Sequence, residues 1–187
     1  MHGNGYTPMT TEAVFMSGAL LVAGAGCVTD VLHRRIPNRL TYSAMLIALP
    51  AHLMFQGWRG LGDSLEGGLI AGGAFLVFFL IHAMGAGDVK LMAAVGSVAG
   101  AEHIVEIVLA TAIAGGIFAI IHSLVHRRLG TVLRNVGSVA GFHAAAGGAV
   151  HPQLNLSNPQ AARMPYGVAI VSGVLFSAIA MYCRGGV

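Results

Sequence analysis

The chain has 187 residues, of which 56% are hydrophobic and 9% are charged, whereas roughly 25% of the residues in a typical soluble domain are charged. This composition leaves too little polar surface for a water-soluble fold. The formal net charge of +3 would suit nucleic acid, but the basic residues are scattered between apolar runs, so we expect no nucleic-acid partner. The sequence therefore predicts an all-α fold, a polytopic membrane helix bundle.

Six apolar runs in a single membrane domain, residues 1–187, are predicted to span the membrane as helices. A polar loop is expected between the second run and the third, at 56–66, with Trp58 and Arg59 as interfacial anchors. A basic amphipathic connection is expected on the cytoplasmic membrane surface at 126–164, where leucine and valine recur at helical spacing. The six predicted spans are 13–29, 40–55, 67–83, 89–100, 104–125 and 165–182.

The run at 89–100 is too short to cross a bilayer alone. At a rise of 1.5 Å per residue it covers roughly 18 Å of a hydrocarbon core of about 30 Å. Either the membrane boundary takes in Ala101 to His103, or the helix starts below the membrane surface. We favour the second interpretation, because a non-helical turn is tolerated at depth where protein or a water-filled recess surrounds it. That turn is Gly85-Ala86-Gly87, directly before Asp88.

The distribution of charge predicts the topology. If the N-terminus and the C-terminus both lie outside, eight of the ten Lys and Arg residues fall on the cytoplasmic side, which satisfies the positive-inside rule. Five of the seven acidic residues then lie at the outer face, and only Asp30 and Asp88 remain inside. The sequence therefore predicts that these two aspartates share one membrane face. The eight basic residues are Arg34, Arg35, Arg39, Lys90, Arg127, Arg128, Arg134 and Arg163.

Two carboxylates that lie close together cannot easily both ionise, so the pair shares a proton. One of them can then activate a water molecule while the other protonates a carbonyl oxygen, which is the chemistry of aspartic proteases. This reaction needs neither a cofactor nor a metal, and the nine histidines show no metal-ligand spacing such as HExxH. Gly85 and Gly87 lack a Cβ, so a substrate backbone can approach the turn closely. Asp30 and Asp88 are the predicted catalytic residues, and the sequence does not assign base and acid between them.

Three motifs occur in order along the chain. They are Asp30 with Ile36-Pro37-Asn38, then Gly85-Ala86-Gly87-Asp88-Val89-Lys90-Leu91, and then Met164-Pro165-Tyr166-Gly167-Val168-Ala169. With the six spans, the chain resembles the small type IV prepilin peptidases of tight-adherence (Flp) pilus systems, which belong to the GxGD class of membrane aspartic peptidases. The resemblance implies removal of the basic leader of type IV-like prepilins, after a glycine, at the cytoplasmic face of the bacterial inner membrane. It also implies Asp30 and Asp88 as the catalytic dyad, with prepilins or pseudopilins and membrane lipids as partners.

The larger prepilin peptidases also methylate the new N-terminus and carry paired CxxC motifs. The sequence contains no CxxC motif, so we expect peptidase activity alone. Other residues of the motifs have structural interpretations beside functional ones: Asp88 and Asn38 suit helix N-caps, and Lys90 either binds substrate or extends to the membrane interface. The residues expected to bind substrate or to support the site are Lys90, Pro37, Asn38, Pro165, Tyr166 and Gly167.

The alternative function is a proton- or ion-coupled membrane carrier, in which paired intramembrane acids relay protons. Carriers usually contain internal repeats and bind their ions near the middle of the membrane. This sequence has no clear internal repeat, and both acids are predicted at one mouth of the bundle. A catalytically silent subunit of a pilus assembly machine is a third reading, which the presence of both acids disfavours.

Overall fold

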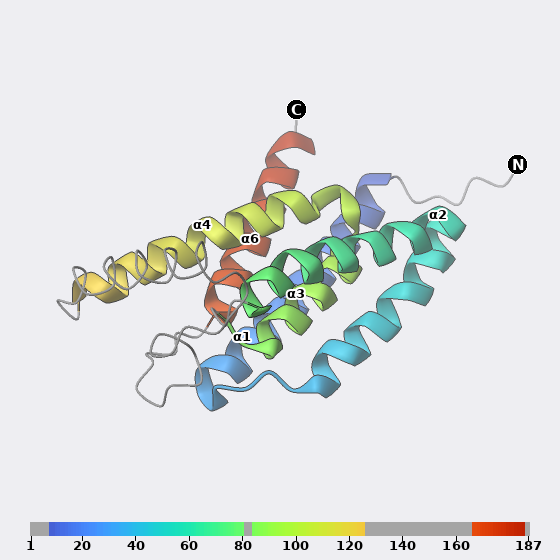
Figure 1. Cartoon of the computed structure of the whole chain (residues 1–187). Helices are drawn as coiled ribbons and strands as arrows, with labels where there is room; N and C mark the ends of the chain where they lie inside the picture. The colour runs from blue at the N-terminus through green and yellow to red at the C-terminus, as the bar shows by residue number, and fades with distance from the viewer. Residues whose placement is uncertain (1–7, 81–83, 126–165, 186–187) are drawn as a thin grey trace, which may run out of the picture.

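The computed structural model describes residues 8–80, 84–125 and 166–185, and within these ranges the regular structure is entirely helical (Figure 1). The predicted all-α fold is therefore confirmed. Four of the helices are long and apolar enough to cross a membrane: α1, α2, α4 and α6. The predicted connection at 126–164, together with Pro165, lies outside the described residues. The helices are α1 (Pro8–His33), α2 (Asn38–Leu80), α3 (Ala86–Ala99), α4 (Ala101–Val125) and α6 (Gly167–Gly185).

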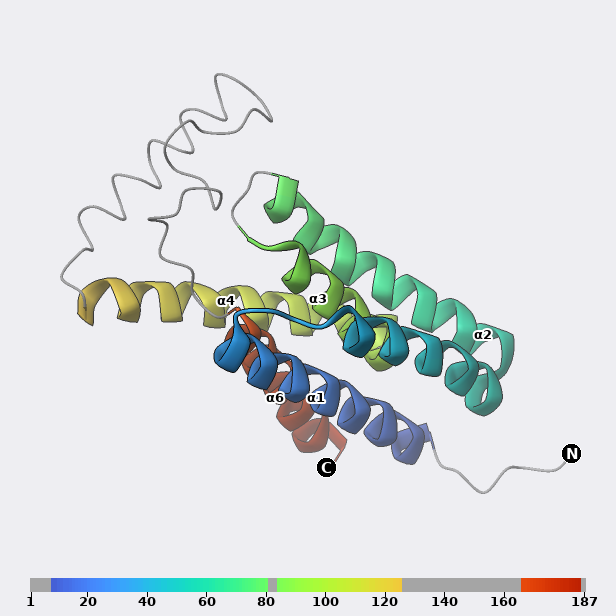
Figure 2. The same cartoon turned by 90° about the horizontal axis from the view of Figure 1, so that it is seen from below.

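The polar loop predicted at 56–66 is wrong, because this stretch is helical apart from one residue. Gly57 has φ 68° and ψ −155°, and α2 reverses its direction there. Its two arms, 38–56 and 58–80, therefore run in opposite directions (Figures 1 and 2). A positive φ costs glycine little, and one such residue is enough to turn the chain. Of the residues that suggested a loop, Trp58 lies on the outside of this elbow and is 80% exposed, whereas Ser64 is buried.

The 43 residues of α2 are more than one crossing requires, since at 1.5 Å per residue they measure about 65 Å against a core of about 30 Å. The two arms thus correspond to the second and third predicted spans. The number of membrane crossings stays a prediction, and α3, with 14 residues, is not among the helices long enough to cross alone.

The most buried helix is α3, which packs against the second arm of α2 and against α1. Glycines permit this close approach. A Cβ on Gly67 would meet the backbone of Gly96, and a Cβ on Gly96 would meet the backbone of Gly67. A Cβ on Gly72 would lie 3.0 Å from the Cβ of Ala93. Small residues therefore hold the two backbones together, as they commonly do in membrane helix pairs.

The C-terminal end of α3 is held by three side chains of α2, which we call the α3 cap: His52, Asp63 and Ser64. The chain turns at Gly100, with φ 83°, and α4 starts at the next residue. Such a junction leaves backbone carbonyl and N–H groups without helical partners, and inside a membrane these groups need protein partners. The cap bonds are His52 Nε2 to Val98 O (3.1 Å), Ser64 Oγ to Ser97 O (2.7 Å) and Ala101 N–H to Asp63 Oδ1 (3.1 Å).

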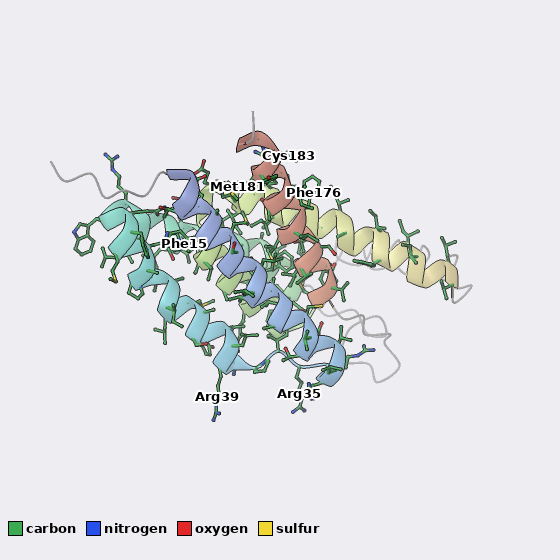
Figure 3. The ribbon with its side chains drawn as sticks, turned by 180° about the vertical axis from the view of Figure 1, so that it is seen from behind. Phe15, Arg35, Arg39, Phe176, Met181 and Cys183 are labelled. Carbon is green, nitrogen blue, oxygen red and sulfur yellow. The ribbon has the colours of Figure 1, made fainter. Side chains whose placement is uncertain are left out.

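The opposite end of the bundle gathers the end of α1 and the starts of α2, α3 and α6 (Figures 1 and 2). In Figure 3, Arg35 and Arg39 project from this end, while Cys183 lies at the other. Cys27 lies one turn before Asp30 and is a free thiol, as is Cys183 at the other end of the bundle. The end that carries Arg35 and Arg39 is the one predicted to face the cytoplasm.

Candidate active site

Asp30 lies near the end of α1, on the face that packs into the bundle. Ala19, Ala23 and Gly26 precede it at helical spacing and are buried, and Asp30 itself is only 9% exposed. This periodicity places the carboxyl group inside the protein. Its Oδ2 accepts a hydrogen bond of 3.0 Å from the backbone N–H of Gly167, the first residue of α6.

Asp88 lies in the first turn of α3 and is partly buried. The N-cap of this helix is Gly85, so the interpretation of Asp88 as the N-cap is wrong. Asp88 instead reaches back, and its Oδ2 accepts the N–H of Gly85 at 3.1 Å. This is one half of a capping box, and it needs the carboxyl group three residues after the cap.

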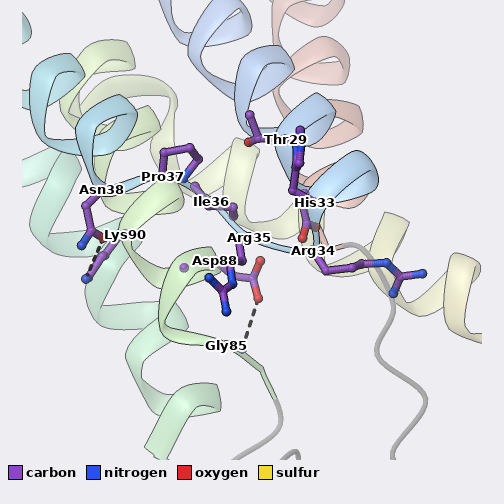
Figure 4. A pocket seen from close by; sticks show the side chains of 12 residues that line it. Thr29, His33, Arg34, Arg35, Ile36, Pro37, Asn38, Gly85, Asp88 and Lys90 are labelled. Carbon is purple, nitrogen blue, oxygen red and sulfur yellow. Dashed lines mark hydrogen bonds between the residues drawn. The ribbon is translucent and has the colours of Figure 1, made fainter.

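The two aspartates line one cavity of about 690 Å³, shown in Figure 4. They therefore lie at one end of the molecule, as their predicted position on one membrane face requires. Of the supporting residues expected from the sequence, Gly85, Gly87, Pro37, Asn38 and Lys90 also line it. The full lining is Thr29, Asp30, His33, Arg34, Arg35, Ile36, Pro37, Asn38, Gly85, Gly87, Asp88 and Lys90.

Among the described residues, three of the predicted site residues do not line this cavity. Ala86 begins α3 and is exposed. Gly167 contacts Asp30 from the far side, through its N–H. Tyr166, one residue earlier, is partly buried, and its hydroxyl would lie 3.1 Å from a Cβ placed on Gly115 of α4. Gly167 therefore bonds Asp30 directly, while Tyr166 lies against α4.

Lys90 ties α3 to the start of α2. Its Nζ donates a hydrogen bond to Asn38 Oδ1 at 3.1 Å, shown dashed in Figure 4, and lies 5.6 Å from the centre of the Tyr42 ring. The prediction that Asn38 caps α2 is wrong, because Asn38 is the first residue of that helix and its side chain accepts from Lys90. These contacts favour a structural role for Lys90 over substrate binding.

Sequence reasoning missed the contribution of the α1–α2 connection to the cavity. Thr29, His33, Arg35 and Ile36 line it, but none of them was predicted as a site residue. Arg34 directly follows α1 and has φ 52°, and its N–H donates to Asp30 O at 2.8 Å. The closeness of these residues to Asp30 in sequence was the signal that could have placed them.

Asp88 and Tyr166 lie outside the four helices that are long enough to span a membrane. The surroundings of each side chain change its pKa. The pKa of Asp88 is raised from 3.8 to about 6, first because burial removes the carboxyl from water and second because Asp30 is nearby, while the N–H of Gly85 lowers it. The pKa of Tyr166 is also raised, by burial and then by Asp88. Tyr166 therefore remains a neutral phenol, and Asp88 can hold or release a proton near neutral pH.

Among the described residues, no group of three or more His, Cys, Asp or Glu side chains is arranged to hold a metal ion. The cavity holds two carboxyl groups, and the pKa of one of them, Asp88, is raised. Such pairs of carboxyls in different environments are typical of acid–base catalysis.

Comparison with known proteins identifies the family. The model of the type IV leader peptidase family matches residues 14–120. The chain belongs to this family. The match includes both Asp30 and Asp88 and confirms the resemblance to prepilin peptidases at the level of the family. No curated protein and no solved structure matches the chain. Membership makes this protein a multi-pass membrane protease of the prepilin leader peptidase type.

Proposed function

We propose that the protein is a GxGD-class aspartic endopeptidase that cleaves the leader from type IV or Flp-like prepilins, with Asp30 and Asp88 as its catalytic dyad. The observation that carries this proposal is that the two carboxyl groups, from α1 and α3, line one cavity in a member of the leader peptidase family. The site faces the cytoplasm in the bacterial inner membrane, which the gathering of Arg35 and Arg39 at this end supports.

The reaction requires one carboxylate and one carboxylic acid at the scissile peptide bond. The carboxylate removes a proton from water as the water oxygen bonds to the carbonyl carbon, and the carboxylic acid protonates the carbonyl oxygen. The resulting gem-diol then collapses, the C–N bond breaks, and a proton passes to the leaving amine. A raised pKa at Asp88 supports this division, because one member of the pair must hold a proton at the working pH.

The glycine turn suits an extended substrate. Gly85 and Gly87 line the cavity beside Asp88, and neither carries a side chain that would keep a peptide backbone away. Ile36 packs against the turn from the other side, where a Cβ on Gly87 would lie 3.4 Å from the Cβ of Ile36. The cavity of about 690 Å³ is within the range of ordinary ligand sites, so a short peptide segment around the scissile bond fits it.

The basic leader of a prepilin meets a basic rim, because Arg34, Arg35 and Lys90 line the cavity together with the two aspartates. Attraction of the leader is therefore assigned to anionic lipid headgroups, which hold basic segments at the cytoplasmic surface. The same basic rim fits contact with lipid phosphate.

Leader removal is proposed to occur without N-methylation of the new N-terminus. The sequence has two cysteines and no CxxC motif, and the described cavity is assigned to proteolysis. Mass spectrometry of the processed pilin tests this point: an unmodified N-terminal amine is expected, and a mass increase of one methyl group would contradict it.

The dyad is tested by co-expression with a prepilin, and removal of the leader is measured as the decrease in prepilin size on a denaturing gel. Asp30→Asn and Asp88→Asn are each expected to abolish processing. Glu102→Gln is the matched control, because Glu102 is an exposed acid in the first turn of α4, outside the cavity. Processing that survives either aspartate substitution would refute the dyad. Proton flux in liposomes distinguishes the carrier function, for which uptake would depend on the same two residues without any prepilin.

A further inference from the structure

A second cavity lies on the surface of the bundle, in a groove between α4 and α6. The two helices pack against each other, and the groove has a volume of about 670 Å³, which is within the range of small-molecule sites. The described residues that line it are all different from those that line the cavity of the proposed dyad. The proposed peptidase chemistry therefore leaves this groove unexplained.

The body of the groove is apolar. Val105, Leu109, Ile113 and Ile117 recur every four residues along α4, so they lie in a row on one face of that helix. Each of the four side chains is more than half exposed. Phe176 lines the groove from α6 and is 58% exposed. Such a surface suits the hydrocarbon of a membrane and needs an apolar occupant.

One end of the groove is charged. Arg184 donates from Nη2 to both carboxylate oxygens of Glu106 at 2.6 Å, and from Nε to Ala180 O at 3.2 Å. Ser177 also donates to Glu106, at 3.3 Å. The second terminal nitrogen of Arg184, Nη1, bonds no described residue. Glu102, one turn before Glu106, is exposed and forms no ion pair with the described residues. This end thus offers a free cationic donor and a free carboxylate.

The length of the apolar row indicates what kind of molecule occupies the groove. Val105 and Ile117 are twelve residues apart, which corresponds to about 18 Å along a helix. One leaflet of a bilayer provides roughly 15 Å of hydrocarbon, half of a core of about 30 Å. A spanning helix, whether of a prepilin or of a second copy of this chain, would extend well beyond the row. A molecule with one polar head and a tail as long as one leaflet matches it.

The charged end indicates the chemistry of the head. A guanidinium group forms strong hydrogen bonds to phosphate, and a carboxylate accepts from a primary ammonium group, which has three donors. A headgroup with phosphate alone would leave Glu102 next to a second negative charge. A trimethylammonium group carries no N–H to donate. The combination of Arg184 and Glu102 is therefore complementary to a head that carries both a phosphate and a primary amine.

We propose that the groove between α4 and α6 binds a phospholipid with a primary-amine headgroup. The phosphate accepts from Arg184, the ammonium group donates to Glu102, and an acyl chain lies along Leu109 and Ile113. Cys183, next to Arg184, lies at the end of the bundle away from Arg35 (Figure 3), so the lipid belongs to the leaflet farther from the dyad. This site is independent of the proposed peptidase function.

The test titrates the purified protein in detergent with phosphatidylethanolamine, phosphatidylglycerol or phosphatidylcholine of identical acyl chains, and native mass spectrometry counts the bound lipid. We expect phosphatidylethanolamine to bind at one site about tenfold more tightly than the other two, the effect of one hydrogen bond to a charged group. Glu102→Gln should abolish this preference. Arg184→Gln should weaken the binding of all three lipids about tenfold. Glu102→Gln breaks no ion pair between described residues, so it tests the site independently of the folding of Arg184→Gln.

The matched controls are Glu66→Gln and Arg59→Gln, which change exposed charges on α2 outside the groove. Both should bind the three lipids as the unmodified protein does. Ala110→Phe tests the apolar part of the site, because Ala110 lines the groove and is partly buried. A phenyl ring there should block the acyl chain and weaken all three lipids about tenfold, although the headgroup contacts are still present.

Equal affinity for the three lipids would overturn the proposal, and so would a preference that survives Glu102→Gln. A species of two chains without bound lipid would assign the groove to a second copy and overturn it as well. Complete displacement of the lipid by a peptide of the prepilin apolar helix would assign the groove to the substrate instead. None of these results changes the interpretation of the dyad variants, because the groove shares no lining residue with the dyad cavity among the described residues.

Discussion

At its C-terminal end, α3 stops at Gly100, and three side chains of α2 bond the backbone groups that the helix leaves open. At its N-terminal end, α3 starts at a glycine turn beside a cavity that holds two carboxyl groups. Both ends of α3 lie in an apolar bundle. At the C-terminal end the open backbone groups are hydrogen-bonded by side chains, and at the N-terminal end the carboxyl groups are accessible from a cavity.

The difference shows which polar groups serve stability and which are available for chemistry. At the α3 cap, donors and acceptors are matched, and His52 is also stacked on Phe15 of α1 with ring centres 3.7 Å apart. A fully bonded buried network of this kind is rigid. At the other end, the Asp88 carboxyl has a pKa raised to about 6, which costs stability at neutral pH. The cap thus anchors the helix whose opposite end carries Asp88, the proposed catalytic group.

The largest expected effect is on the rate of leader cleavage, from substitutions at the N-terminal end of α3. Asp88→Asn should reduce the rate of leader cleavage by about a thousandfold or more, because residues that act as a unit lose nearly all activity together. The double variant Asp30→Asn with Asp88→Asn should be no slower than either single variant. Rates from purified protein and a prepilin peptide check this. Additive losses in the double variant would indicate that the two carboxyls act independently.

The next effect is at the α3 cap. His52→Ala removes the bond to Val98 and the stacking on Phe15, so we expect a loss of about 3 kcal/mol in the free energy of unfolding. Ser64→Ala should cost about 1 to 2 kcal/mol, because it leaves a buried carbonyl without its donor. Ser43→Ala, on the exposed side of the first arm of α2, is the control and should be neutral. Unfolding in mild detergent measures all three, and equal stability of the Ser64 and Ser43 variants would contradict the cap.

The pH dependence of stability distinguishes the two ends further. Because the pKa of Asp88 is raised to about 6 in the folded protein, the folded state binds more protons than the unfolded state between about pH 4 and pH 6. The contribution of Asp88 to the free energy of unfolding is therefore complete at low pH. It is lost as the pH rises through 6, by at most about 3 kcal/mol. Tm measured at pH 4.5 and pH 7.5 should show this fall. Asp88→Asn should lose this part of the pH dependence, and an unchanged slope in that variant would assign it to another group.

The smallest effect is expected for the tie between α3 and α2. Lys90→Met and Asn38→Ala each break the hydrogen bond of 3.1 Å between them, and because this bond is exposed, their coupling energy should be below about 1 kcal/mol. Cleavage should persist in both variants, with a modest rise in KM. A double-mutant cycle measures the coupling. Loss of cleavage in Lys90→Met alone, with Asn38→Ala unaffected, would return Lys90 to a role in substrate binding.

Much of the fold could be predicted from the chain because membrane helices are read from composition and charge. The apolar runs, the shortness of the fourth run and the shared end of Asp30 and Asp88 all follow from local patterns and from the positive-inside rule. The loop at 56–66 could not be predicted correctly, because polarity does not reveal that a single positive-φ glycine, Gly57, reverses a helix. The α3 cap was also missed, since its bonds join residues 33 to 46 positions apart.

For the site, the sequence by itself determined which carboxyl groups could meet, because charges are rare in this chain and only two acids fall on the basic side. The tertiary structure decided how they differ. Asp30 receives the N–H of Gly167 because two helices 137 positions apart pack through a glycine, and Asp88 lies where burial raises its pKa. Both effects arise from the surroundings of a carboxyl group, which are created only when distant helices pack together.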